Sequence, residues 1–228
     1  MTIYREIIMN NQKNYIKELE KVVSKFLEPI KGIPFPIAIK ALYGFEVLPF
    51  EISDRKKQEL LKLLSKAAEI AGINANRKGI FTARPNEAGN HIEPFVIKAL
   101  NEVGLKAEKP VSKRGKRKSA GYPDIQIETR NGIIIYLDCK TYNTLSKNQS
   151  FRSFYFSPSK DPKITKDAFH LLMSFELNIT KREGRNAFIP VSWHIYTLDK
   201  LIVQVKHEFN ASNKDLYTSD ALLAEGKI

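Results

Sequence analysis

The stretch "GYPDIQIETRNGIIIYLDCK", residues 121–140, decides how the fold of this chain is built. It holds two runs rich in apolar residues, and the turn residues Asn131 and Gly132 separate them, which is the pattern of a β-hairpin. Charged groups nevertheless stand at one end of the two runs: Asp124 opens the first run, and Asp138 and Lys140 close the second. The register of the hairpin decides whether these three charges meet.

The apolar pattern selects the length of the turn. A two-residue turn would place Ile125 opposite Asp138 and mix the two faces, whereas a three-residue turn gives one continuous apolar face. We therefore predict a three-residue loop, residues 130–132, with Gly132 in the left-handed conformation of a G1-bulge turn. The expected pairs are Thr129 with Ile133, Ile127 with Ile135, Ile125 with Leu137 and Asp124 with Asp138.

This register places Asp124 beside Asp138 on the polar side of the hairpin, and Lys140 shares that side because side chains alternate along a strand. Two carboxylates at cross-strand distance repel each other unless a cation lies between them. A divalent metal supplies such a cation, and oxygen ligands that leave room for water and phosphate suit Mg²⁺. The alternative is that Asp124 caps a turn and Lys140 keeps a strand end soluble.

Pro123-Asp124, followed after a spacer of 13 residues by Asp138-Cys139-Lys140, resembles the signature of the PD-(D/E)xK nucleases. The run "YPDIQI…IIIYLDCKTYN" is similar to the active-site hairpin of type II restriction endonucleases of the EcoRV kind, whose strand also ends in Asp-x-Lys-Thr. The resemblance covers about residues 87–145.

The resemblance implies roles for individual residues. Asp124 and Asp138 would ligate Mg²⁺, together with the backbone carbonyl of Cys139, while the Cys139 thiol would point into the core. Lys140 would orient or activate the attacking water and help to neutralise the phosphate. The family also places an acidic residue on a helix before the first core strand, and Glu93 in "GNHIEPFVIKAL" occupies that place, with Glu87 as the alternative. A carboxylate at a helix start is also favoured by the helix dipole alone.

Positive charge is concentrated close to the hairpin. The net charge is +12 and the pI about 9.6, a balance typical of proteins that bind a polyanion, either nucleic acid or an anionic membrane surface. Clustering favours nucleic acid, and we define the basic loop as residues 109–118, "KPVSKRGKRK". Its alternatives are a solvated, disordered loop or a nuclear localisation signal. A second basic stretch, "ITKREGRNA", could read base edges or form a surface turn. The predicted DNA-binding residues are Lys113, Arg114, Lys116, Arg117, Lys118, Lys181, Arg182 and Arg185.

The remaining chain alternates between helix and strand patterns. Apolar residues at helical spacing predict helices over residues 11–30, 54–71 and 90–103, the second with Ser53 as its N-cap and Gly72 at its end. Strands are expected in "GLKAEKPV", "SFRSFYFSPS", "AFIPVSWHIYTL" and "LIVQVKHEF", while "KITKDAFHLLMSFEL" fits helix or strand. The order predicts an α/β (α+β) fold, a restriction-endonuclease-like mixed sheet flanked by helices. Residues 1–80 would form a helical region for scaffolding or dimerisation, and residues 81–228 the nuclease core with its DNA-binding loops.

Several classes of protein are excluded or disfavoured. Cys139 is the one cysteine, so an internal disulfide or a zinc site built from several cysteines is ruled out. No run of about 18 apolar residues and no Gly-rich phosphate loop occur, which predicts a cytoplasmic protein without a membrane span and without ATP use.

The expected activity is that of a Mg²⁺-dependent type II restriction endonuclease acting on double-stranded DNA. It would be a homodimer that cuts a short, palindromic site to leave 5′-phosphates, with a cognate DNA methyltransferase as its genetic partner. A junction resolvase, a repair nickase and a non-catalytic DNA-binding protein are the alternatives.

Overall fold

The computed structural model describes residues 2–82, 87–118, 121–143, 154–206, 212, 220 and 222–224, and of residues 2–13 it describes the backbone alone. The chain forms two compact units, one made of Met1–Ile33 with Val203–Ile228 and the other of Pro34–Ile202. These units do not divide at residue 80, where the sequence suggested a boundary. Helix α3 (Arg55–Lys78) packs on the central sheet and belongs to the same unit.

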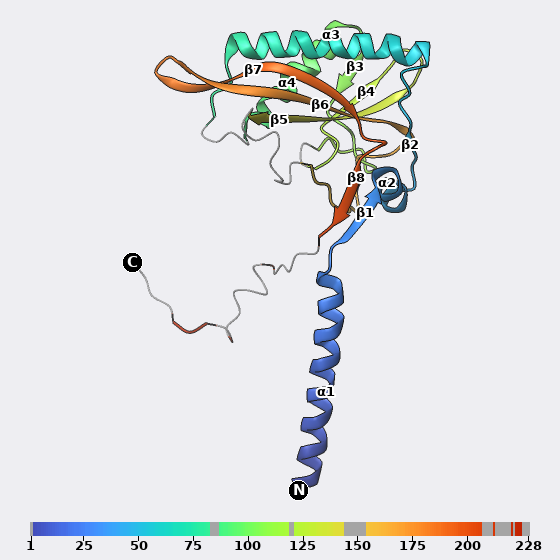
Figure 1. The fold of residues 1–228 in the computed structure, drawn as a ribbon, viewed down its shortest axis with the longest axis vertical. Helices are drawn as coiled ribbons and strands as arrows, with labels where there is room; N and C mark the ends of the chain where they lie inside the picture. Colours follow the sequence, from blue (N-terminus) through green and yellow to red (C-terminus); the bar gives the residue numbers. More distant parts are fainter. Residues whose placement is uncertain are drawn as a thin grey trace. The chain divides into compact units, whose positions relative to one another are not determined.

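The first unit contains helix α1 (Thr2–Leu27) and a two-stranded sheet in which β1 (Ile30–Pro34) pairs with β8 (Ile202–Val205) (Figure 1). Helix α1 starts earlier in the chain than the apolar spacing of residues 11–30 indicated. Large apolar side chains on it are exposed, namely Tyr15, Ile16, Leu19, Val22, Phe26 and Leu27. Among the described residues, no helix has both the length and the apolar character that crossing a membrane requires.

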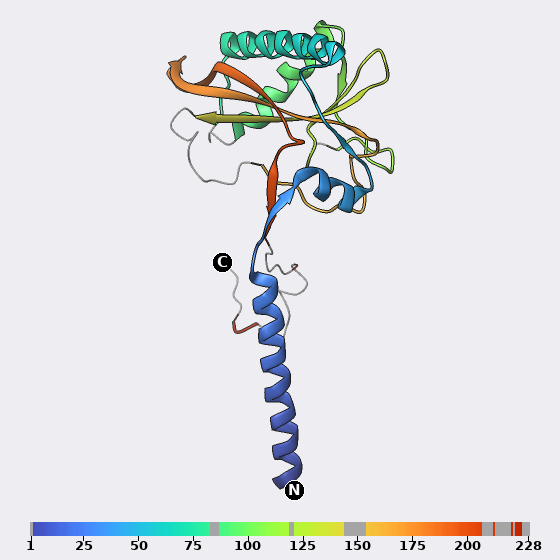
Figure 2. The same cartoon turned by 45° about the vertical axis from the view of Figure 1, so that its right-hand side comes forward.

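The second unit is built on a mixed sheet of six strands (Figures 1 and 2). The order is β2-β6-β5-β4-β3, and β7 also pairs with β6. Strands β5 and β6 run parallel, whereas β3–β4, β4–β5 and β6–β7 are antiparallel pairs. The bounds are β2 Val47–Leu48, β3 Lys106–Glu108, β4 Ile125–Glu128, β5 Ile134–Asn143, β6 Ala168–Arg182 and β7 Arg185–Thr197.

The β4–β5 hairpin has the predicted register. Ile125 lies opposite Leu137 and Ile127 opposite Ile135. The Thr129 amide donates to the Ile133 carbonyl at 3.0 Å, which closes a loop of residues 130–132, and Gly132 has a φ of 74°. The three-residue loop and the left-handed glycine are therefore confirmed.

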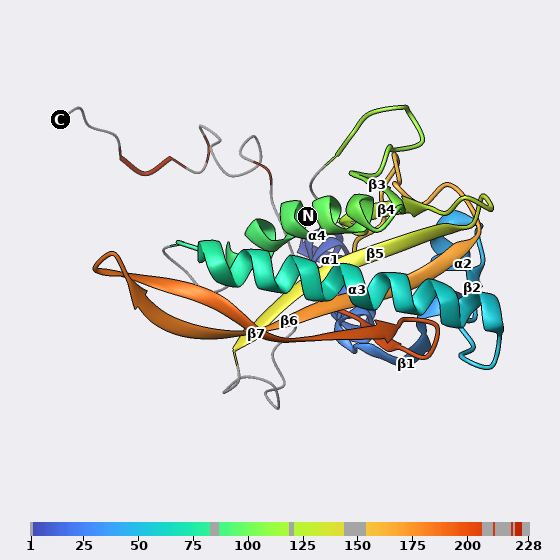
Figure 3. The ribbon, with the colours of Figure 1, turned by 90° about the horizontal axis from the view of Figure 1, so that it is seen from above.

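Helices cover both faces of the sheet (Figures 1 and 3). Helices α3 and α4 (Ala88–Glu102) lie across one face, and α2 (Phe35–Tyr43) lies against the other. The odd-numbered side chains of β4, β5 and β6 face α3 and α4 and form the main core with them. Its fully buried members include Leu64, Ile92, Val96, Leu100, Ile125, Ile127, Ile135, Leu137, Met173 and Phe175. The mixed α+β architecture expected from the sequence is confirmed.

Both predicted ends of α3 are wrong. Asp54, not Ser53, is the N-cap, because its carboxylate accepts from the Lys56 amide at 2.8 Å and the Lys57 amide at 3.4 Å. The helix continues through Gly72, which faces Phe175, and ends before Gly79, whose φ is 75°.

Two other segments differ from the expectation. The described part of "SFRSFYFSPS", residues 154–159, forms no strand, and residues 150–153 lie outside the described residues. Helix α2 and strand β2 were not foreseen. The ambiguous segment "KITKDAFHLLMSFEL" contains the first part of strand β6, residues 168–177. This part is buried on both faces and therefore shows a continuous apolar run instead of an alternating one.

Strand β7 is interrupted near its middle. The register of the β6–β7 pair shifts between Glu176 and Leu177, so that Val191 is an extra residue between Pro190 and Ser192. The Pro190 carbonyl accepts from the Asn76 side chain of α3 at 2.8 Å. Such an insertion is a β-bulge, which bends the strand locally.

Candidate functional site

Asp124 directly precedes Ile125 and Asp138 directly follows Leu137, so the two carboxylates lie together at the end of the paired part of the β4–β5 hairpin. The Asp124 amide donates to the Leu137 carbonyl at 3.2 Å, one residue out of the register of the Ile125–Leu137 pair, so the regular ladder ends at Ile125. The Asp124 carboxylate accepts from the Cys139 amide at 2.8 Å. Backbone and side chain of Asp124 are thus both held by β5.

Asp138 is the buried member of the pair, since only 3% of it is exposed. Burial and the charge of Asp124 raise the pKa of the Asp138 carboxyl to about 7, although Lys140 opposes the shift. The Lys140 ammonium lies 2.7 Å from Asp138 Oδ2. Burial alone would lower the pKa of Lys140, but the charge of Asp138 outweighs it, so the pKa is raised and Lys140 keeps its proton.

Glu93 reaches the same cluster from α4. Its side chain is buried and forms an ion pair with Lys109, the first residue of the basic loop. Burial raises the pKa of the Glu93 carboxyl; the hydrogen bond from Lys109 opposes this, and the charge of Asp124 adds to it. Glu87 stands exposed at the N-cap of α4. The structure therefore brings Glu93, and not Glu87, close to Asp124.

Lys163 also belongs to the cluster, although the sequence motifs gave no sign of it. Only 4% of this lysine is exposed. Its ammonium donates to the carbonyls of Gly121, at 2.5 Å, and Pro123, at 2.8 Å. Burial lowers the pKa of Lys163, while the charges of Asp124, Glu93 and Asp138 oppose that shift. Lys163 is 39 positions beyond Asp124 in the chain, so only the fold could reveal it.

The side of the hairpin that carries Asp138 is not open to solvent, which corrects the expectation of a polar face. Tyr136 and His170 share this face and their rings are 5.1 Å apart. The Tyr122 hydroxyl lies 2.6 Å from His170 Nδ1, and burial lowers the pKa of His170 to about 3. Rings from α2 and the 154–159 segment complete this aromatic cluster, which comprises Phe35, Tyr122, Tyr136, Phe154, Phe156 and His170.

The donor atoms at this end of the hairpin fit a divalent cation. Asp138 Oδ2 is buried without a regular hydrogen bond, and the Lys140 ammonium lies 2.7 Å from it as an ion-pair partner, so a bound cation would share this oxygen with Lys140. The set is sparse, because the described residues contain no group of three or more His, Cys, Asp or Glu side chains placed to hold a metal. Two carboxylates and a backbone carbonyl would leave coordination positions for water and phosphate, as Mg²⁺ prefers. Burial raises the pKa of the Cys139 thiol well above its usual value, and its side chain lies in the core.

The basic loop is ordered over residues 109–118 and folds back on itself through pairing of Val111 with Arg117. Two predicted DNA contacts are engaged in ion pairs, Arg117 with Glu108 at 2.7 Å and Lys118 with Asp161 at 2.6 Å. The side chains of Lys113, Arg114 and Lys116 are exposed. These three side chains are the ones available to a polyanion.

The tip of the β6–β7 hairpin carries the second basic stretch, and two of its cations have structural contacts. Arg182 donates to the carbonyls of Asn76, at 2.6 Å, and Arg77, at 2.9 Å, and so satisfies carbonyls at the end of α3. Arg185 lies over the Phe81 ring at 4.9 Å and pairs with Glu183. Lys181 is exposed.

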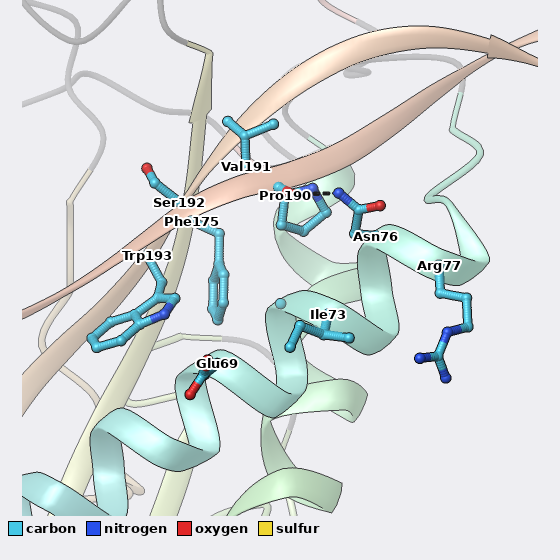
Figure 4. A pocket seen from close by; sticks show the side chains of 10 residues that line it. Glu69, Ile73, Asn76, Arg77, Phe175, Pro190, Val191, Ser192 and Trp193 are labelled. Atoms are coloured by element: carbon cyan, nitrogen blue, oxygen red, sulfur yellow. Dashed lines mark hydrogen bonds between the residues drawn. The ribbon is translucent and has the colours of Figure 1, made fainter.

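A hollow is present on the other face of the sheet from Asp138. It has a volume of about 680 Å³ and lies between α3 and β7, where Phe175 and Trp193 point toward Glu69 and Ile73 (Figure 4). Phe175 belongs to the odd-numbered face of β6, whereas Asp138 is paired with Leu172 on the even-numbered face. The carboxylates of the hairpin and this cavity therefore lie on opposite faces of the sheet.

Comparison with known proteins identifies the family of the chain. Residues 29–220 match the family described as type II restriction enzyme MjaV. The chain is 37% identical to the type II restriction enzyme MjaV of Methanocaldococcus jannaschii, over 94% of this chain and 98% of that protein. The expectation of a site-specific DNA endonuclease is thereby confirmed, and the chain belongs to the MjaV family of type II restriction enzymes.

Proposed function

We propose that this enzyme is a Mg²⁺-dependent endonuclease that hydrolyses phosphodiester bonds of double-stranded DNA at a short, palindromic site and leaves 5′-phosphates. The observation that carries the proposal is the meeting of Asp124, Asp138 and Lys140 at one end of the β4–β5 hairpin in a chain of this family.

The metal would be held by Asp124, Asp138 and the backbone carbonyl of Cys139. Mg²⁺ bound there would stabilise the negative charge that develops on the phosphate and its leaving oxygen. Buried Asp138 Oδ2 supports this assignment because it lies in an ion pair with Lys140 without a regular hydrogen bond, so a cation could share it. The identity of the metal rests on the all-oxygen donor set.

Lys140 and Glu93 would act on water and phosphate. The Lys140 ammonium keeps its proton beside Asp138, so it can orient the attacking water and offset phosphate charge. The Glu93 carboxyl, buried near Asp124, would hold a water molecule or a second cation.

DNA would be bound first by the exposed cations of the basic loop, Lys113, Arg114 and Lys116, because this loop is tied to the carboxylate cluster through the Lys109–Glu93 ion pair. Two copies related by two-fold symmetry would match a palindromic site. A cognate DNA methyltransferase would protect the same site in the host genome.

The proposal is tested with purified enzyme and unmodified plasmid. Discrete linear fragments are expected with MgCl₂, and no cleavage with EDTA. Asp124→Ala and Lys140→Ala should each lower the cleavage rate by about 10²-fold or more, because each removes a group aimed at the reacting phosphate. Glu93→Gln should also slow cleavage, whereas Glu87→Gln, at the exposed start of α4, serves as the matched control and should not.

The outcomes separate the proposal from its rivals. Single-strand nicks without linear fragments, or cleavage confined to branched DNA, would favour a nickase or a junction resolvase. Full activity in both alanine variants would show that the hairpin is not the active site.

A further inference from the structure

Lys163 stands out because a buried ammonium is costly unless carbonyls or carboxylates compensate it. Its two acceptors are the backbone carbonyls of Gly121 and Pro123. They belong to the turn that leads directly into Asp124, the first of the two carboxylates.

The Pro123 carbonyl and the Asp124 amide are the two ends of one peptide unit. Lys163 holds the oxygen end at 2.8 Å, and the Leu137 carbonyl holds the N–H end at 3.2 Å. Because the peptide unit is planar, fixing both ends fixes the orientation of that plane and the position of the Asp124 Cα, which carries the side chain. The Cys139 amide then holds the carboxylate itself at 2.8 Å.

The segment that carries Lys163 also holds the basic loop. Asp161 accepts from the Arg114 amide at 2.9 Å and pairs with Lys118 at 2.6 Å, and the Pro162 carbonyl accepts from the Lys113 amide at 2.9 Å. Residues 161–163 therefore contact the basic loop on one side and the Asp124 turn on the other.

We propose that Lys163 is a positioning residue of the cation site, which orients the Asp124 carboxylate through the Pro123 carbonyl, and that residues 161–163 connect the basic loop to that carboxylate. The inference rests on the proposed function, since it concerns the same metal site. Lys163 touches neither metal nor phosphate in this role, and acts through Asp124.

Cation affinity distinguishes positioning from simple charge compensation, because the two roles predict opposite changes in affinity when Lys163 is removed. If Lys163 only added positive charge near the carboxylates, its removal would strengthen the binding of a metal cation to them. If it orients Asp124, its removal weakens binding, and loss of a group that supports a metal ligand typically lowers affinity by about 10- to 100-fold.

The test measures Mn²⁺ binding to the whole protein without DNA, by calorimetric titration, and Mg²⁺-dependent plasmid cleavage in parallel. Lys163→Met should weaken Mn²⁺ binding by about tenfold or more. Lys163→Gln, which loses the charge but keeps two N–H donors, should recover most of that loss. Lys109→Met is the matched control, because it also removes a cation from this cluster. Lys109 bonds to Glu93 and not to the 121–123 turn. The Lys109→Met variant should therefore bind Mn²⁺ at least as tightly as the wild type.

Thermal unfolding of each variant reports whether it is folded. Should the methionine variant fail to fold, Lys163→Ala, which leaves space for water at the two carbonyls, replaces it in the same comparison. Unchanged or tighter Mn²⁺ binding by the Lys163 variants, in a wild type that binds and cleaves, would overturn the inference alone. An equal loss in Lys109→Met would overturn it too, while a wild type that neither binds Mn²⁺ nor cleaves would overturn the proposed function itself.

Discussion

Asp138 combines deep burial with a neighbouring carboxylate, a combination that works against stability when the residue is ionised. Its pKa of about 7 in the folded protein lies above the ordinary value of 3.8. The folded state therefore binds more protons than the unfolded state between about pH 4 and pH 7, so stability from this group is present at low pH and is lost as pH rises. Pre-arranged charges of this kind are common at functional sites.

Asp138→Asn should remove this pH dependence. In EDTA, the free energy of unfolding of the wild type should fall by about 2 kcal/mol more than that of the variant between pH 5 and pH 8. Urea unfolding at several pH values gives the free energy of unfolding of each protein as a function of pH. Parallel curves for the two proteins would mean that Asp138 ionises normally.

At the scale of single residues, the sequence predicted those parts of the site that lie on one hairpin. Asp124, Asp138 and Lys140 could be aligned because the alternation of apolar residues fixes the register of neighbouring strands. Glu93 came from the family resemblance. Lys163 and the aromatic cover over Asp138 could not be predicted, because they depend on contacts between segments far apart in the chain.

Helix α3 shows how local chemistry sets the limits of an element. Ser53 and Asp54 are adjacent and both are good N-cap residues, so spacing alone cannot choose between them. The structure chooses Asp54, which accepts two amide hydrogen bonds. Strand β6 posed the opposite difficulty, since burial on both faces removed the alternation that identifies a strand.

Exchange of the two candidate caps tests this assignment. Asp54→Ala should lower the free energy of unfolding by about 1 kcal/mol, because the amides of Lys56 and Lys57 lose their acceptor. Ser53→Ala should leave it within about 0.5 kcal/mol of the wild type. Chemical denaturation of both variants gives the comparison, and the reverse order of effects would restore Ser53 as the cap.

The two glycines of α3 should respond in opposite ways to alanine. At Gly72 a Cβ atom would lie 3.5 Å from Phe175, an ordinary contact, so Gly72→Ala should stabilise by about 0.5 kcal/mol through lower chain entropy. Gly79 has a φ of 75°, which disfavours any side chain, so Gly79→Ala should destabilise by about 1 kcal/mol or more. Melting temperatures of the pair would contradict this account if Gly72→Ala were the less stable variant.

For the whole molecule, the high positive charge divides into cations that hold the fold and cations that face solvent. Arg182, Arg117 and Lys118 contact carbonyls or carboxylates of the protein, whereas Lys113, Arg114 and Lys116 are exposed. From the sequence alone all six were predicted to contact DNA, because composition reports charge without reporting its partners. The mixed fold, in contrast, followed from the order of periodic segments.

Salt dependence of DNA binding should separate these two groups. In an Asp124→Ala background that prevents cleavage, each of Lys113→Ala, Arg114→Ala and Lys116→Ala should reduce the slope of log K against log salt by about 1. Arg182→Ala should instead lower thermal stability and leave the slope unchanged, since it removes two bonds to the end of α3. Fluorescence anisotropy with a linear duplex at several salt concentrations measures the slopes.

The bulge in β7 also disfavours pairing of this strand with the sheet edge of another copy of the chain. A strand at the edge of a sheet offers a row of backbone groups with which another chain can pair, the usual start of edge-to-edge aggregation. Here Pro190 has no N–H to offer, its carbonyl already accepts from Asn76, and Val191 falls out of register. The Phe188 amide and carbonyl are already bonded to Ile80, so an incoming strand would meet residues 192–197 beyond the bulge instead of one template of 13 residues. Asn76, Pro190 and Val191 thus limit edge-to-edge pairing along β7.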